Sequence, residues 1–189
     1  MFNTFLEANF VPNGWLTAHV KPLFKKGVCS DCNNYRSISL SCVSCKVMER
    51  LIATDMLFYL RNNNLITKHQ HGFLNRHSTC TQLIETINDW SIAFEIKFSV
   101  DSAYLDFAKA FDMVSHHKLI FKLESYGVSG NILGWITAFL TNRIQRVHVG
   151  NCLSSLINVI SGVPQGSVLG PILFIIYIND VSDFFTSHM

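Results

Sequence analysis

The sequence predicts an α+β fold, because runs with helical periodicity alternate with short runs typical of paired strands. Apolar residues recur at helical spacing in Ser44–Tyr59 and in Thr79–Phe94. Two pairs of short runs rich in β-favouring residues are separated by polar or glycine-containing connections, which indicates two β-hairpins. With 49% hydrophobic and 12% aromatic residues, the 189-residue chain can form a substantial core.

The first predicted hairpin lies near the N-terminus. Its strands are expected over Trp15–Phe24 and Tyr35–Leu40, joined by the polar loop Lys25–Asn34. Pro12–Gly14 predicts a turn before the first strand. The helix that follows the hairpin is expected to end at the polar run Arg61–Asn64.

The middle of the chain predicts one further strand and two further helices. A polar loop over His69–Ser78 precedes the second long helix. Phe98–Leu105 is rich in aromatic and β-favouring residues, so we expect a strand that ends on Asp106. Helices are predicted over His116–Tyr126 and Asn131–Leu140.

The second predicted hairpin pairs Arg143–Val149 with Leu156–Ile160 around Gly150–Asn151. The sequence Ser-Gly-Val-Pro-Gln-Gly-Ser follows at Ser161–Ser167, where glycine and proline predict a bent loop. An apolar helix is then expected to begin near Gly170–Pro171, because proline suits the first turn of a helix.

The formal net charge is only +2, but the charges are unevenly distributed. Residues 1–80 carry nine Lys and Arg against four Asp and Glu, whereas residues 81–189 carry six against nine. This division fits a protein that binds phosphate with one part and metal with the other, although ordinary fluctuation gives such patterns too. Charged residues make up 15% of the chain, below the usual quarter, which favours a piece that packs against another surface.

No targeting or membrane segment is predicted. Met1–Phe10 lacks a basic start, and Glu7 interrupts its apolar residues, so it does not resemble a signal peptide. The longest apolar run, Val168–Ile178, is far shorter than the ~20 residues that cross a bilayer. We therefore expect an intracellular protein, with nucleus and cytoplasm equally open.

The six cysteines include two pairs with the spacing of zinc ligands, Cys29 with Cys32 and Cys42 with Cys45. A small zinc module is therefore one hypothesis. The gap between the pairs is short, however, and the second pair lies in an apolar run with helical spacing. Cysteines in such a run are usually small core residues, which we favour here.

Several blocks in a fixed order carry a resemblance that no single block would establish. In particular, Leu105–Asp112 places a carboxylate, Asp106, after an apolar run, where an aspartate on its own is more often a cap than a ligand. The chain resembles reverse transcriptases of non-long-terminal-repeat retrotransposons of the jockey-like type. The matching blocks are Asn13–Trp15, Val20–Gly27, Asn34–Leu40, Lys46–Arg50, Gln70–Phe73, Leu105–Asp112 and Ser161–Asp180.

The resemblance implies a role for the segment that begins at Asp106. Polymerases of this kind join nucleotides with two divalent ions about 4 Å apart. Asp106 is expected to bind such an ion, Mg²⁺ or Mn²⁺, together with the backbone carbonyl of Phe107. Phe111 is expected to lie beneath the incoming sugar and to reject a 2′-hydroxyl. Asp112 is expected near the site without binding metal.

The resemblance also implies nucleotide-binding residues in two other places. Gln165 and Gly166 are expected to pack against the nucleotide and the template base. Arg36 is expected to clamp the triphosphate, because a guanidinium binds phosphate oxygens in a bidentate fork. Lys25 or Lys26, across the hairpin, would add a point charge.

The implied architecture is that of a right-hand polymerase, with a fingers-like region at 1–97, a partial palm at 98–189 and no thumb. Its partners would be an RNA template, a DNA primer and deoxynucleoside triphosphates. The loop that contains His69, His71 and His77 would lie on the template side, so these histidines are expected to be solvated or to face RNA.

The resemblance places an aromatic-x-Asp-Asp hairpin beyond Asn179–Asp180, and the sequence to Met189 does not contain it. With Asp106 but without the Asp-Asp hairpin, the site would not bind two metal ions well. We therefore expect an RNA-directed DNA polymerase fragment that is inactive alone. The alternative is a non-catalytic RNA-binding remnant that retains the basic fingers.

Overall fold

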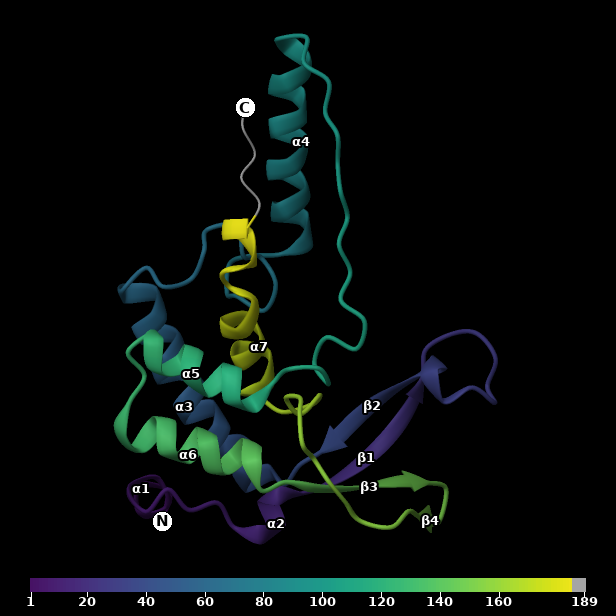
Figure 1. Ribbon diagram of the computed structural model, residues 1–189, viewed down its shortest axis with the longest axis vertical. Coiled ribbons are helices and arrows are strands. Elements are labelled where there is room, and N and C mark those ends of the chain that lie inside the picture. The colour runs from purple at the N-terminus through teal and green to yellow at the C-terminus, as the bar shows by residue number, and fades with distance from the viewer. Residues whose placement is uncertain (185–189) are drawn as a thin grey trace.

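The computed structural model describes residues 1–184 and combines a mixed β-sheet with a group of helices (Figure 1). The sheet order is β2-β1-β3-β4, and β5 also pairs with β3. This arrangement confirms a fold that mixes helices with a sheet. The strands are β1 (Thr17–Phe24), β2 (Tyr35–Leu40), β3 (Ile144–Val149), β4 (Cys152–Leu153) and β5 (Ile157–Asn158).

Helices gather beside one end of the sheet, whereas α4 (Thr79–Glu95) stands away from them (Figure 1). Within residues 1–184, no helix has the length and apolar character needed to cross a membrane. The helices are α1 (Phe2–Glu7), α2 (Asn13–Leu16), α3 (Val43–Asn62), α4 (Thr79–Glu95), α5 (His116–Ser125), α6 (Gly130–Thr141) and α7 (Gly170–Ile178), with 3₁₀ turns at Cys32–Asn34 and Val181–Phe184.

Both predicted hairpins are present. β1 and β2 are antiparallel, with Val20 opposite Ser39, and a long loop joins them. β3 is antiparallel to both β4 and β5. The additional pairing is parallel and joins β1 to β3, with Val20 opposite Val147. Local periodicity gives no signal for this pairing, because its partners lie far apart in the sequence.

The core lies between α3, α5, α6 and α7, and both the N-terminal and the C-terminal parts of the chain contribute to it. Trp135 is fully buried and stacks on Phe139 with ring centroids 5.3 Å apart. Leu60 of α3, Leu119 of α5 and Leu173 of α7 are likewise fully buried. Burial of apolar surface at this meeting point of helices is the main stabilising term of the fold.

Two predicted elements are wrong. Phe98–Leu105 is irregular rather than a strand, and Tyr104 is 85% exposed. A strand needs a neighbour for its N–H and C=O groups, and within residues 1–184 no strand pairs with this stretch. Pro12–Gly14 is not a simple turn, since Asn13 and Gly14 begin α2.

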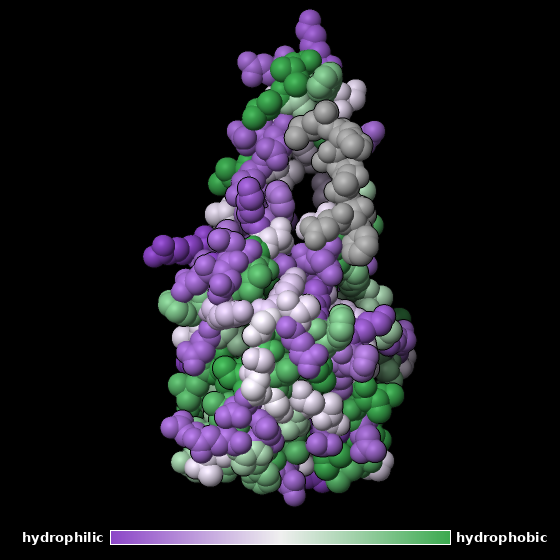
Figure 2. All heavy atoms as spheres, turned by 60° about the vertical axis from the view of Figure 1, so that its left-hand side comes forward, coloured by the Kyte–Doolittle hydropathy of each residue, from purple (hydrophilic) through white to green (hydrophobic). Residues whose placement is uncertain are grey.

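The helix α4 is confirmed, but none of its residues is buried. Leu83, Ile87 and Phe94 lie on its predicted apolar face, and each is more than half exposed. Figure 2 shows apolar side chains at the surface of this projecting end of the molecule. The helix forms nonetheless, because Ser78 and Thr81 make a capping box at its first turn.

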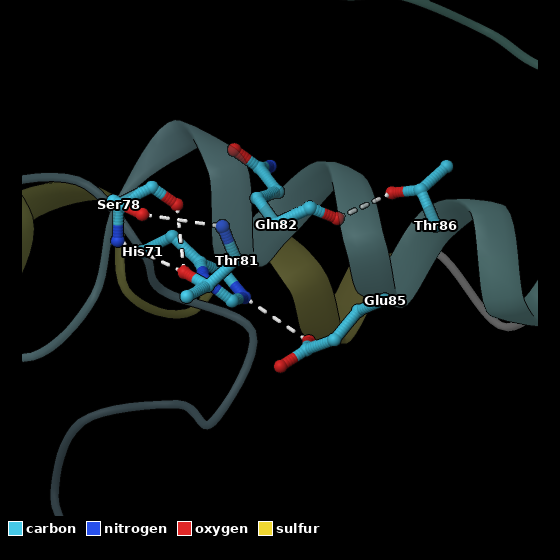
Figure 3. A network of polar contacts seen from close by, with 6 residues as sticks. All are labelled: His71, Ser78, Thr81, Gln82, Glu85 and Thr86. Atoms are coloured by element: carbon cyan, nitrogen blue, oxygen red, sulfur yellow. Dashed lines mark hydrogen bonds and ion pairs between the residues drawn. The ribbon is translucent and has the colours of Figure 1, made fainter.

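His71 joins the base of α4 to the preceding loop (Figure 3). Its ring nitrogens lie 3.1 Å from Thr81 Oγ1 and 3.1 Å from Glu85 Oε2. The side chain is buried, so the expectation that it is solvated or faces RNA is wrong. A buried imidazole requires partners for both nitrogens, and α4 supplies them. His69 and His77 are exposed, as expected.

Candidate nucleotide-binding site

The structure joins the loop Ser161–Ser167 to the residues that follow Asp106, although the two lie about fifty residues apart. The N–H of Val163 donates to the carbonyl of Phe111 at 2.8 Å, and the N–H of Gly162 donates to that of Val114 at 2.7 Å. The Ser161 hydroxyl donates to the carbonyl of Asp112 at 3.0 Å. The two stretches that carry most of the sequence signal are therefore hydrogen-bonded neighbours.

The same loop also contacts the first hairpin. The N–H of Ser39 in β2 donates to the carbonyl of Gln165 at 2.7 Å. Gly166 has φ +113°, and a Cβ there would lie 2.7 Å from the carbonyl oxygen of Ser39. Gly162 has φ +90°, and a Cβ there would lie 2.9 Å from backbone atoms of Phe111 and Asp112. Both positions require glycine, for the backbone conformation and for the close approach.

His116, at the start of α5, holds the loop from another side. Its Nε2 lies 2.7 Å from the carbonyl oxygen of Gly162. A carbonyl only accepts hydrogen bonds, so Nε2 carries a proton in this contact. At the other end of the loop, the Ser167 hydroxyl accepts a hydrogen bond from the N–H of Gly170 at 2.8 Å. The loop backbone is thus fixed along most of its length.

A cavity of about 280 Å³ lies between the loop and one face of the sheet. Ser37, Arg143, Gln145 and Gln165 are among the residues that line it. Arg143 is buried, and its guanidinium lies over the Phe139 ring, 4.8 Å from the centroid. Its Nη1 and Nη2 have no hydrogen-bond partner among the described residues. Burial lowers the pKa of this guanidinium, and the nearby Cys45 and Glu49 oppose that effect.

Phe111, the predicted sugar-facing residue, is held by other aromatic rings. It stacks on Phe174 of α7 with ring centroids 4.8 Å apart and an interplanar angle of 17°. Phe73 approaches it edge-on at 6.0 Å. Phe111 is only partly buried, so part of its ring stays accessible beside the loop. Such packing fixes the orientation of an aromatic side chain.

The predicted metal ligands lie in the irregular stretch and are not gathered into a metal site. Asp106 is exposed, and Phe107 is 51% exposed. Within residues 1–184 no group of three or more His, Cys, Asp or Glu could hold a metal ion. A lone exposed carboxylate does not fit a two-ion centre, which needs converging carboxylates. Cys29, Cys32, Cys42 and Cys45 are free thiols and are not part of such a group within the described residues.

The predicted phosphate-binding residues lie on the first hairpin. Arg36 is in β2 opposite Leu23, and Lys25 follows the end of β1. Lys25, Lys26 and Arg36 are all exposed. None of the three forms an ion pair with another described residue. The hairpin loop extends away from the helices, so these cations are accessible (Figure 1).

Sequence reasoning missed three residues that shape this region: Glu49, His116 and Arg143. All three are buried, although each can carry a charge. Their types alone gave no signal, because Arg and Glu are mostly surface residues and His is intermediate in burial. The position of Glu49 in Lys46–Arg50, one of the ordered blocks, was the clue available.

Comparisons with known proteins agree with the motifs. Residues 23–189 match the family described as "Reverse transcriptase (RNA-dependent DNA polymerase)". The "RNA-directed DNA polymerase from mobile element jockey" of Drosophila melanogaster is 34% identical over 96% of this chain, and that of Drosophila funebris is 35% identical over the same share. The "Probable RNA-directed DNA polymerase from transposon X-element" of Drosophila melanogaster is 32% identical over 96% of this chain.

In each of these alignments the chain covers 20% of the relative, so it spans about a fifth of the length of the curated relatives it matches. The match nevertheless runs through almost the whole of this chain. It includes the hairpin with Arg36, the stretch around Asp106 and the loop Ser161–Ser167. The chain therefore belongs to the reverse transcriptase family, and its likeness is to the enzymes of non-long-terminal-repeat mobile elements.

Proposed function

We propose that this chain provides the nucleotide-positioning part of an RNA-directed DNA polymerase, as a fingers-like region at 1–97 and a partial palm at 98–189. The observation that carries the proposal is the loop Ser161–Ser167, which is hydrogen-bonded to Phe111–Val114 on one side and to Ser39 on the other. The substrates would be an RNA template, a DNA primer and deoxynucleoside triphosphates. Such a protein acts inside the cell, in the nucleus or the cytoplasm.

The hairpin cations would bind the triphosphate. Arg36 carries a rigid fork of donors that matches phosphate oxygens, and Lys25 or Lys26 adds a mobile positive charge nearby. Their exposure and their lack of ion pairs among the described residues support this role, because no protein carboxylate competes with the phosphate. We expect their contribution to weaken as salt increases.

Phe111 and the loop would select and orient the nucleotide. The Phe111 ring is fixed by Phe174, so a sugar lying against it would meet a rigid surface. An additional 2′-hydroxyl would clash with such a surface, which favours deoxynucleotides. The carbonyl of Gln165 accepts from the N–H of Ser39, and Gln165 is one of the residues that line the cavity. Its side-chain amide can both donate and accept hydrogen bonds.

Catalysis would need more than the described residues supply. Reverse transcriptases use divalent metal ions, and the candidates here are Asp106 and the carbonyl of Phe107. Because these two do not make a metal site within residues 1–184, we propose that the chain binds nucleotide and template without extending a primer on its own. The remaining carboxylates would come from elsewhere in a longer protein.

Two measurements on poly(rA)/oligo(dT) test the proposal. The affinity for dTTP is expected to fall about tenfold or more in Arg36→Ala, because a hydrogen bond to a charged group is lost. Arg50→Ala, which removes an exposed arginine of α3, is the matched control and should leave dTTP affinity unchanged. Equal affinities in wild type, Arg36→Ala and Arg50→Ala would contradict the triphosphate role.

Primer extension with magnesium tests the catalytic part. Neither the wild-type chain nor Asp106→Ala is expected to extend the primer. Extension that disappears in Asp106→Ala would show that the chain completes its own metal site, and the claim of inactivity would be wrong. Circular dichroism of both proteins verifies that a negative result does not come from unfolding.

The alternative function is RNA binding without any nucleotide site. The accessible cations Lys25, Lys26 and Arg36 favour it, since a basic hairpin binds any phosphate backbone. Both functions predict salt-sensitive RNA binding. They differ in dTTP binding, because an RNA-binding remnant would bind no dTTP either as wild type or as Arg36→Ala, and its RNA affinity would be the same with and without nucleotide.

A further inference from the structure

Glu49 of α3 is a fully buried carboxylate whose hydrogen bonds lead to the far end of the loop Ser161–Ser167. Its Oε2 accepts from the N–H of Val168 at 2.7 Å and from the N–H of Leu169 at 3.0 Å. Its Oε1 accepts from the Cys45 thiol at 3.4 Å. Val168 and Leu169 lie between the loop and the first turn of α7, so Glu49 holds the junction of the two.

These two contacts pair N–H groups just before α7 rather than in its first turn. Leu169 occupies the N-cap position and has no side-chain acceptor, and the N–H of Gly170 in the first turn donates to the Ser167 hydroxyl instead. The positive end of the helix dipole also favours a carboxylate at this place. A buried carboxylate is tolerated only where hydrogen bonds and opposite charge compensate its desolvation, and the nearby buried Arg143 contributes charge.

Glu49 and Ser39 hold the two sides of one short segment. The N–H of Ser39 fixes the carbonyl of Gln165, and three residues later the carboxylate of Glu49 fixes the N–H of Val168. The backbone around Gly166 is held between these points. Both anchors belong to consecutive elements, β2 and α3, so the first hairpin and the loop cannot shift independently.

We propose that Glu49 is a positioning residue for the nucleotide site: it fixes the exit of the loop, and with it the place of Gln165 and Gly166. The inference rests on the proposed function and extends it to a residue that would touch neither nucleotide nor template. Glu49→Met is the natural test, because methionine has a similar length but no oxygen that could accept from Val168 and Leu169. All three bonded donors then lose their carboxylate acceptor.

The experiment combines amide hydrogen exchange with two affinities, on the full 189-residue chain. In Glu49→Met, exchange at Val168 and Leu169 is expected to become about tenfold faster or more, while amides of α5 and α6 keep their rates. The affinity for dTTP on poly(rA)/oligo(dT) is expected to fall about fivefold or more. The affinity for poly(rA) alone should stay unchanged. Asp55→Asn, an exposed carboxylate of the same helix, is the matched control and should change none of these quantities.

Three results would overturn the proposal. Unchanged exchange at Val168 and Leu169 would show that the hydrogen bonds do not hold the junction. Faster exchange throughout the core, with equal losses of dTTP and RNA affinity, would make Glu49 a structural residue only. Faster exchange at Val168 and Leu169 without a change in dTTP affinity would show that the exit of the loop does not affect nucleotide binding. If the wild type itself binds no dTTP, the proposed function fails, and the exchange data alone then describe a loop anchor.

A wild-type measurement covers the case in which Glu49→Met does not fold. Helix α6 begins at Gly130 without a side-chain cap, so its first N–H groups are a reference for an unprotected helix start. Val168 and Leu169 are expected to exchange at least about tenfold more slowly than Gly130 and Asn131. Equal rates would contradict the anchoring role without any variant.

Discussion

Helices α4 and α7 both carry many apolar residues, but they differ in how far these residues are buried. Five residues of α7 are buried, whereas none of α4 is. The start of α7 is held by Glu49, and its apolar side chains pack in the core. The base of α4 is held by His71, and the rest projects from the molecule (Figures 1 and 3). Apolar periodicity therefore predicts that a face needs covering, but not that a neighbour in the same chain covers it.

The exposed face of α4 continues into the stretch 98–105. Ile96 and Phe98 are each more than half exposed, and Leu105 is 68% exposed. Exposed apolar side chains in both of these segments favour contact with further polypeptide. The low charge content of the chain predicts the same. The part around α7, by contrast, needs no further partner to bury its apolar residues.

The comparison predicts that the same substitution has very different effects in the two helices. Leu173→Ala in α7 removes a fully buried side chain and is expected to lower the free energy of unfolding by about 2–5 kcal/mol. Leu83→Ala in α4 is expected to change it by no more than about 0.5 kcal/mol, because Leu83 is 59% exposed. Urea unfolding followed by circular dichroism measures both. A large loss in Leu83→Ala would mean that α4 is covered in solution.

A second prediction concerns the glycines that let the loop approach its neighbours. Gly166→Ala requires a side chain at φ +113° and a Cβ 2.7 Å from the Ser39 carbonyl oxygen, so it is expected to cost about 2 kcal/mol or more. Gly14→Ala is the matched control, since nothing lies within 4 Å of its Cβ. It should be neutral or slightly stabilising. Chemical unfolding of both variants measures these changes in stability. Equal midpoints for the two variants would show that the loop does not need its close contact with β2.

A third, smaller effect is expected at the base of α4. His71→Ala removes the side chain that bonds Thr81 and Glu85, at an expected cost of about 1 kcal/mol confined to this helix. Limited proteolysis should therefore cut between residues 79 and 95 faster than in the wild type, while α7 stays resistant. His69→Ala replaces an exposed histidine of the same loop and should leave the cleavage rate unchanged. If it accelerates cleavage equally, the loop as a whole rather than His71 holds α4.

The helices and hairpins could be predicted because their signals are local, as capping residues, turns and periodicity. Glu49 and His116 could not, since their partners lie 119–120 and 46 residues away in the sequence. The prediction of a strand at Phe98–Leu105 was wrong for the opposite reason. Its composition favours a strand, but within residues 1–184 no neighbouring strand pairs with it. The glycines of Ser161–Ser167 predicted a bent loop, but the sequence did not name Ser39 as the neighbour that Gly166 approaches.

Helix α3 shows the same contrast at two cysteines, one at its exposed start and one buried. The smallest predicted effect compares the reactivity of these two thiols. Cys42 is exposed at the N-cap, and the hydrogen bond with Ser44 and the backbone lowers the pKa of its thiol. Cys45, one turn later, is buried beside Glu49, and burial together with that carboxylate raises the pKa of its thiol.

The thiolate is the reacting form, so a lower pKa means a larger reactive fraction near neutral pH. Iodoacetamide at pH 7.5 is therefore expected to label Cys42 well before Cys45, as peptide mass spectrometry would show. Ser44→Ala should slow labelling at Cys42, because it removes the hydrogen bond that contributes most to the lowered pKa of this thiol. It should leave Cys45 protected. Early labelling of Cys45 would mean that the junction held by Glu49 opens in solution, and the anchored region would then resemble α4 more than the structure indicates.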